Sequence, residues 1–146
     1  MQLKPPSPGQ KSRFSYTTNG LDSLSLALLA CRLKTTPDIN KSPLVIITNS
    51  AFEAQRLLEE IPFFWRNSKT NPNSEPSLKL SVHLLPDWET LPYDVFSPHP
   101  DLISERLATL YQISQNQCDV VIVPIATALI RLSAVAYLAG HSFILK

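Results

Sequence analysis

Apolar and polar residues follow one another along the chain in blocks that predict strands and helices in turn. The run 44–48 (LVIIT) is apolar and mostly β-branched, which is typical of a strand buried on both faces. Residues 80–85 and 119–124 (DVVIVP) are predicted as two further strands, and residues 142–145 as a last one. We expect these short segments to form one sheet.

Helices are predicted between the strands, from apolar residues three and four positions apart. Residues 21–33 and 50–60 both show this spacing. Pro62 should end the second helix, because proline lacks the backbone N–H that a helix interior needs. The apolar faces are formed by Leu21, Leu24, Leu28 and Cys31 in the first helix and by Phe52, Leu57 and Ile61 in the second.

A third helix is predicted from Asp101, which follows a proline and whose carboxylate can cap the first turn. The residues at helical spacing form one apolar stripe: Ile103, Leu107, Leu110 and Tyr111. Glu105 and Arg106 lie off this stripe, so we expect them to be solvated or paired. A short helix at 127–132 completes the alternation.

Alternating strands and helices predict an α/β domain, with a mostly parallel sheet between two layers of helices, of the RecA- or Rossmann-like kind. A length of 146 residues suits one domain, which we place at 17–146. Residues 1–16 are expected to be a flexible tail. In such sheets ligands bind beyond the carboxyl ends of the strands, which makes the segments after them candidate surfaces.

The segment 87–100 (DWETLPYDVFSPHP) fits neither a strand nor a helix, and its prolines restrict the backbone. Its aromatic residues are Trp88, Tyr93 and Phe96, and its acidic residues are Asp87, Glu89 and Asp94. Two interpretations remain open: the aromatic rings close one end of the core, or they contact a partner. We expect burial for Phe96, with a loss of about 3–5 kcal/mol on truncation. If the segment is a contact surface, Trp88 and Tyr93 are its best anchors.

The pattern DWETLPYDxFSPHxDxISxRLxTLYQ at 87–112 resembles the N-terminal region of the bacterial transcription-repair coupling factors, the Mfd family. The resemblance continues at 121–132 and 137–141. It implies a UvrB-like module with a degenerate nucleotide site, acting as a non-catalytic interaction or regulatory domain. The candidate interaction surface consists of Asp87, Trp88, Glu89, Tyr93, Asp94 and Arg106.

The resemblance also implies what the complete proteins do. They use ATP-driven translocation on DNA to displace stalled RNA polymerase, and they recruit UvrA for nucleotide excision repair. ATP and Mg are expected only in their motor domains, so this chain is expected to hold no cofactor and to contact other domains of the complete factor. Because the chain ends at Lys146, directly after a predicted strand, we expect it to be a piece of such a cytoplasmic protein.

The sequence carries no motif for nucleotide binding or catalysis. A phosphate-binding loop needs Gly-x-x-x-x-Gly-Lys-Ser/Thr, whereas no lysine follows Gly20 at that spacing and Asp22 would repel phosphate. No G-x-S-x-G motif is present, and the histidines are far apart: His83, His99 and His141. A pair of loop carboxylates could form an acid–base or metal site. The alternative is a stand-alone small-molecule-binding domain or enzyme of α/β type, and the missing phosphate loop and the missing nucleophile–base motif both count against it.

Composition and charge narrow the function classes. The formal net charge is +1, so direct DNA binding by this chain is not predicted. Apolar residues make up 44% of the chain, but their runs are too short to span a membrane, and no apolar signal core follows Lys4. Cys31 and Cys118 are too isolated for a disulfide framework or a zinc site, and we expect both to be small buried apolar side chains.

Overall fold

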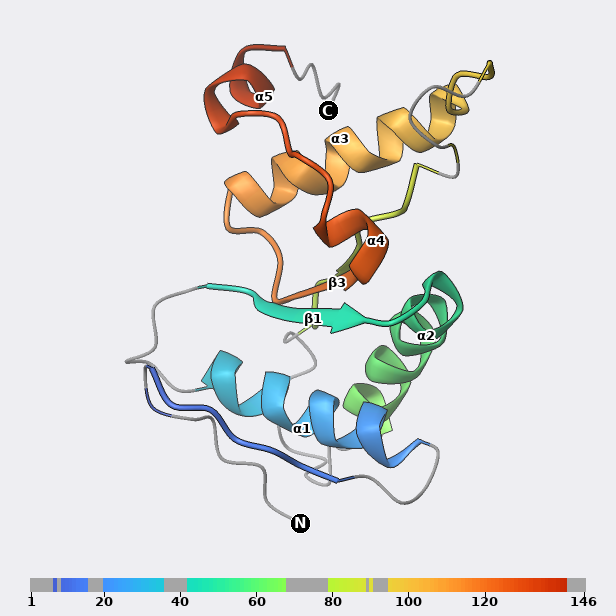
Figure 1. Ribbon diagram of the computed structural model, residues 1–146. Coiled ribbons are helices and arrows are strands. Elements are labelled where there is room, and N and C mark those ends of the chain that lie inside the picture. Colours follow the sequence, from blue (N-terminus) through green and yellow to red (C-terminus); the bar gives the residue numbers. More distant parts are fainter. Residues whose placement is uncertain are drawn as a thin grey trace.

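Helices and strands alternate along most of the chain in the computed structural model (Figure 1), which describes residues 7, 9–15, 20–35, 42–67, 79–88, 90 and 95–141. The elements are α1 (Leu21–Thr35), β1 (Leu44–Thr48), α2 (Ala51–Asn67), β2 (Val82–Leu84), α3 (Pro100–Ser114), β3 (Val120–Pro124), α4 (Ile125–Ala128) and α5 (Val135–His141). Helix α5 was not among the predicted elements. The strand predicted at 142–145 lies outside the described residues.

The described strands form one sheet in the order β1-β3-β2, and both pairings are parallel. β3 is central, because Ile46 of β1 and Leu84 of β2 both align with its Ile122. Parallel neighbours need crossover connections, and α2 and α3 provide them after β1 and β2. The predicted α/β class with a parallel sheet is therefore confirmed.

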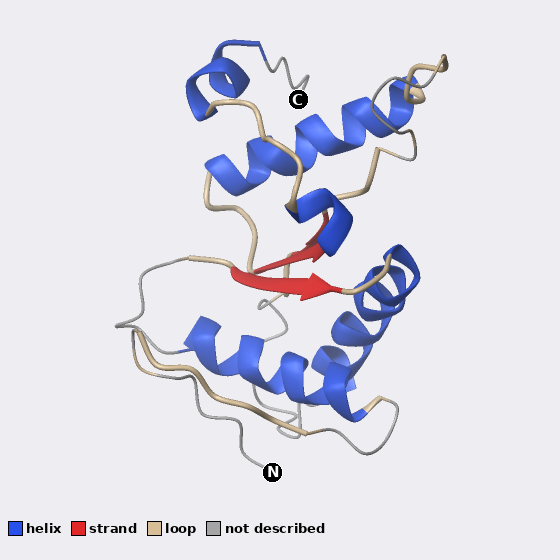
Figure 2. Cartoon of the chain, in the orientation of Figure 1, coloured by secondary structure: helices blue, strands red, loops and turns tan. Residues whose placement is uncertain are grey.

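Helices lie on both sides of the strands (Figure 2). On one side, Leu57 and Ile61 of α2 join Ile122 of β3 in a core cluster to which α1 also contributes. On the other side, Leu110 of α3 and Leu138 of α5 pack together with the opposite face of β3. Successive residues of a strand point to opposite faces, so β3 is buried along its whole length.

β1 is buried on one face only, and the prediction of a strand covered on both faces is wrong. Ile46 and Thr48 are buried. Val45 and Ile47 point to the other face and are 57% and 59% exposed, so no part of the described chain covers them. An apolar run shows that a strand is suited to burial, but the number of layers around it depends on the rest of the fold.

The helix predicted at α1 is confirmed, but its buried face differs from the prediction. Ser23, Ala27 and Ala30 are buried, whereas Leu28 is exposed. α1 packs against α2, and small side chains at four- and three-residue spacing allow the two helices to approach closely. The packing partner, rather than the size of the apolar side chains, therefore decides which face is buried.

α2 continues beyond Pro62, where the sequence predicted its end. Leu57 and Ile61 are buried as expected, but Phe52 is 83% exposed. A proline inside a helix removes a backbone hydrogen bond and costs about 3 kcal/mol. Trp65, almost one turn beyond Pro62, is part of the core, and its burial keeps the end of α2 on the sheet.

The N-cap of α3 is His99, whose Nδ1 accepts a hydrogen bond from the backbone N–H of Asp101 at 3.3 Å. The cap predicted at Asp101 is therefore wrong by two positions. Leu110 is buried as expected, but Leu107 is exposed. Arg106 is buried instead, because α3 contacts the segment that follows β2.

Candidate interaction site at the end of strand β2

The predicted contact segment follows β2 at the carboxyl end of the parallel sheet. β2 ends at Leu84, and Leu85 continues beside β3 because its N–H donates to the carbonyl of Ile122 at 2.9 Å. Leu85 is buried, while Asp87 and Trp88 are half-buried. The chain therefore passes from the core to the surface between Leu85 and Trp88.

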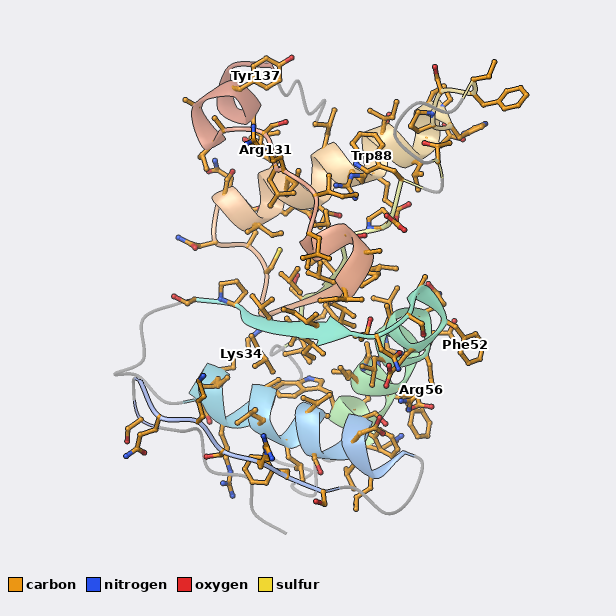
Figure 3. All side chains as sticks on the ribbon, in the orientation of Figure 1. Lys34, Phe52, Arg56, Trp88, Arg131 and Tyr137 are labelled. Atoms are coloured by element: carbon orange, nitrogen blue, oxygen red, sulfur yellow. The ribbon has the colours of Figure 1, made fainter. Side chains whose placement is uncertain are left out.

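Arg106 of α3 holds this segment in place. Only 3% of the residue is exposed, and its guanidinium donates a hydrogen bond to the carbonyl of Pro86. The same guanidinium lies over the ring of Trp88, with its central carbon 4.5 Å from the ring centroid. Figure 3 labels Trp88 on the segment between β2 and α3. The ring quadrupole attracts a cation in this position. Arg106 is thus paired with a carbonyl and an aromatic ring, and it is buried against Trp88. Its part in the contact surface stays a prediction.

The electrostatics of Arg106 follow from this burial. Desolvation lowers the pKa of the guanidinium, and the negative charge of Asp87 opposes that shift. Arginine nevertheless remains protonated in proteins. The segment after β2 therefore packs against a guanidinium that stays positively charged.

Asp87 connects the same segment to α4. Its Oδ1 accepts hydrogen bonds from the N–H of Trp88 at 2.8 Å and from the hydroxyl of Thr127 at 3.3 Å, and Thr127 is completely buried. Thr109 of α3 donates its hydroxyl to the carbonyl of Leu84 at 3.3 Å. Buried polar side chains from two helices therefore define the backbone path from Leu84 to Trp88. Neither threonine was predicted to have this role, although Thr109 belongs to the 87–112 pattern.

The structure brings Asp87, Trp88 and Arg106 together, as three neighbours in one cluster. The other predicted members of the surface, Glu89, Tyr93 and Asp94, lie outside the described residues. Within the described ranges, no group of three or more His, Cys, Asp and Glu side chains is placed to hold a metal ion. Asp87 uses one oxygen for internal hydrogen bonds, which favours a structural role for its carboxylate.

Val95 and Phe96 form an exposed apolar tip between this segment and α3, here called the Val95–Phe96 tip. Val95 is 94% exposed and Phe96 is 81% exposed. The prediction that Phe96 closes the core is therefore wrong. Leu110 and Leu138 fill the core on this side of the sheet. One sequence signal was available: no apolar residue follows Phe96 at strand or helix spacing before the next helix.

Comparison with curated proteins places the chain in a family. A transcription-repair-coupling factor of Escherichia coli (strain K12) is 37% identical over 126 residues, which cover 86% of this chain and 10% of that protein. The chain belongs to the transcription-repair-coupling factor family. The resemblance carried by the 87–112 pattern is therefore confirmed. No protein-family model matches the chain.

Two further transcription-repair-coupling factors match over shorter stretches. The protein of Haemophilus influenzae is 43% identical over 65 residues, which cover 44% of this chain and 6% of the relative. The protein of Rickettsia bellii is 25% identical over 91 residues, which cover 62% of this chain and 7% of the relative. The chain thus spans about a tenth of the length of the Escherichia coli relative.

In this member of the transcription-repair-coupling factor family, the first turn of α1 carries an ion-pair network. Asp22 Oδ2 lies 2.5 Å from Arg56 Nη2, and Glu60 Oε2 lies 2.8 Å from Arg56 Nη1. The hydroxyl of Ser23 also donates to Glu60, at 2.5 Å. The Arg56 guanidinium holds the pKa of Asp22 below its usual value. The carboxylate of Asp22 is therefore charged and paired with the guanidinium of Arg56.

A serine–histidine pair lies at the start of β2, at the end of the sheet opposite to the segment that contains Asp87 and Trp88. Ser81 Oγ and His83 Nε2 are 2.8 Å apart. Asp119 accepts hydrogen bonds from the N–H of Ser81 at 2.7 Å and from the ammonium of Lys34 at 2.6 Å. If His83 were a catalytic base, it would need a third group to orient its ring. The nearby carboxylate of Asp119 instead accepts its hydrogen bonds from Ser81 and Lys34. The arrangement favours a structural role that joins α1, β2 and β3.

The two thiols fit the apolar environments expected for them. Cys118 is buried and its pKa is raised, mainly by that burial, while Cys31 packs at the edge of the core. Both are free thiols. In the part of the chain that the structure describes, no helix is long and apolar enough to cross a membrane.

Proposed function

We propose that this chain is the N-terminal, non-catalytic interaction module of a transcription-repair-coupling factor. The observation that carries the proposal is the 37% identity to the Escherichia coli factor over 86% of this chain. The anchored segment after β2 adds to it, because Asp87, Arg106 and Thr109 of the 87–112 pattern all serve to shape that segment. A satisfied network of buried polar groups favours a single backbone path.

The complete factor, in this proposal, carries out the activity in other domains. It uses ATP and Mg in a motor that translocates on DNA, displaces stalled RNA polymerase and recruits UvrA, and it works in the cytoplasm. The present chain supplies a UvrB-like, RecA-like layer that lacks a working nucleotide site. Support comes from the name that the relatives share and from the small part of their length that this chain covers.

Trp88 is the proposed anchor of the contact surface. Its ring is held by the guanidinium of Arg106, and its backbone N–H is held by Asp87. Rigid aromatic side chains often contribute most of the free energy of an interface. A group that is already ordered loses less conformational entropy on binding. The exposed part of Trp88 is therefore suited to binding a protein partner.

Binding measurements on the intact chain test the proposal. The immobilised chain is exposed in turn to purified UvrA, to purified RNA polymerase and to the Escherichia coli factor without its matched region. We expect binding to at least one of these proteins. Trp88→Ala should raise the Kd about tenfold or more, which corresponds to about 1.4 kcal/mol, because the anchor ring is lost.

Phe52→Ser is the matched control, because Phe52 is an exposed aromatic residue on α2, on the other side of the sheet (Figure 3). Its substitution should leave the Kd unchanged. A folded chain that binds none of the three proteins would contradict the proposal. A Trp88→Ala chain that is severely destabilised in a thermal melt would instead show that Trp88 serves mainly to close the core.

A further inference from the structure

The Val95–Phe96 tip is a second apolar feature of the segment between β2 and α3. It follows Trp88 by seven positions in the sequence. Both side chains keep most of their surface in water. Exposed apolar side chains that occur singly are common, but two adjacent ones at a loop tip form a small patch. Such a patch indicates a binding surface when the backbone beside it is ordered and charged side chains surround it.

We propose that the Val95–Phe96 tip inserts into an apolar pocket with a basic rim on a protein partner. This inference rests on the proposed function and adds the surface chemistry of the partner to it. The partner is defined by that chemistry: a cavity large enough for a phenyl ring, with Lys or Arg side chains at its margin.

The backbone on the C-terminal side of the tip is firmly held. Pro98 and Pro100 restrict φ at their positions. His99 caps α3 through the N–H of Asp101, and its own carbonyl accepts from the N–H of Ile103 at 3.2 Å. α3 in turn is fixed to the core by buried residues such as Leu110. A partner would therefore bind an apolar tip whose attachment to the fold is already ordered, at a low cost in entropy.

The charges beside the tip indicate the kind of partner. Asp101 and Glu105 are both exposed and lie four residues apart on the first turns of α3, so they share one face of the helix. The imidazole of His99 lies 3.4 Å from the carboxylate of Asp101. Exposed carboxylates favour a basic rim on the partner and disfavour the phosphates of nucleic acid. A protein pocket is therefore favoured over insertion of the ring between DNA bases.

The binding assay described above tests the inference with three variants. Phe96→Ser should raise the Kd about tenfold or more and leave the Tm of the chain unchanged, because the ring is 81% exposed. Glu105→Lys should also raise the Kd, and this effect should shrink as the salt concentration rises, because salt screens exposed charges. Phe52→Ser removes a similarly exposed ring from α2 and should have no effect.

The outcomes separate the inference from the proposed function. Unchanged binding by Phe96→Ser, together with weak binding by Trp88→Ala, would overturn the inference and leave the proposed function standing. No binding by the unaltered chain to any of the three proteins would overturn both. A short fluorescent DNA duplex is the second probe. Binding of this duplex that is lost in Phe96→Ser would assign the tip to nucleic acid and overturn the inference.

Discussion

Arg106 is a charged side chain at a position where helical spacing alone indicated solvent or an acidic partner. In the structure its guanidinium contacts a carbonyl and an aromatic ring, and neither partner can be identified from spacing along α3. Burying a charge costs free energy unless its hydrogen-bonding groups are used. At the residue scale, the burial of Arg106 therefore depends on the backbone path of residues 85–88, which follow β2.

Arg106→Met is expected to lower the free energy of unfolding by about 2 kcal/mol. The substitution keeps much of the side-chain volume, but it removes the charged donor to the carbonyl of Pro86, and hydrogen bonds of this kind contribute about 1.5–3 kcal/mol. Equilibrium unfolding in urea measures the change. Glu105→Gln, at an exposed neighbouring position, should stay within about 0.5 kcal/mol of the unaltered chain. Equal stability of the two variants would show that water replaces the guanidinium.

His83 is expected to make stability depend on pH. Burial lowers its pKa below the ordinary value of 6.5, and Asp119 opposes the shift. The unfolded chain therefore takes up this proton at a higher pH than the folded chain does. The stability that this group contributes is complete above pH 6.5 and is lost as the pH falls through 6.5 toward the folded pKa.

Thermal melts of the unaltered chain and of His83→Gln measure this effect. Acidification from about pH 7.5 to about pH 5 should lower the Tm of the unaltered chain more than that of the variant. A difference between the two melting temperatures that stays constant over this range would contradict the expectation.

Among the elements, α1 shows that the type of a helix and its orientation have different origins. Its leucines and alanines favour a helix at any orientation. The orientation follows from α2, against which the small residues Ser23, Ala27 and Ala30 are buried. α2 itself is longer than its pattern indicated, because burial of Trp65 holds the turn after Pro62 in the core.

Ala27→Leu is expected to destabilise the chain by about 1–3 kcal/mol, because a larger side chain must fit into the closely packed contact between α1 and α2. Leu28→Ala is the control at the next position, which is exposed. Its effect should be well below the cost of a buried truncation. Urea unfolding of both variants measures the two changes. A larger effect at Leu28 would mean that the leucine face of α1 is the one that packs.

For the molecule as a whole, the sheet is covered unevenly. β3 is enclosed on both faces, whereas Val45 and Ile47 leave an apolar strip on β1 uncovered by the described chain. Strands of this kind at a sheet margin favour association with other chains. The fold class, the parallel pairing and the family all agree with the sequence analysis. The RecA-like details of the fold stay a prediction.

We expect the chain to self-associate through this strip. Val45→Thr with Ile47→Thr should then reduce the association and change the Tm little, because both side chains are exposed. Sedimentation velocity at increasing protein concentration measures the first effect. Ile46→Thr alone is the matched control: it alters a buried residue of the same strand and should lower the Tm. Unchanged self-association in the double variant would show that another surface is responsible.

The sequence by itself determined the kinds of element, most of their order, the parallel α/β class and the family, because periodicity, proline positions and the 87–112 pattern are local properties. Only the tertiary structure decided which side of α1 is buried, that β1 is covered on one face, that Phe96 is exposed and that Arg106 lies beneath Trp88. These features depend on which elements meet across the sheet. Residues far apart in the chain, such as Asp87 and Thr127, become neighbours only when β2 and β3 pair and their following segments converge.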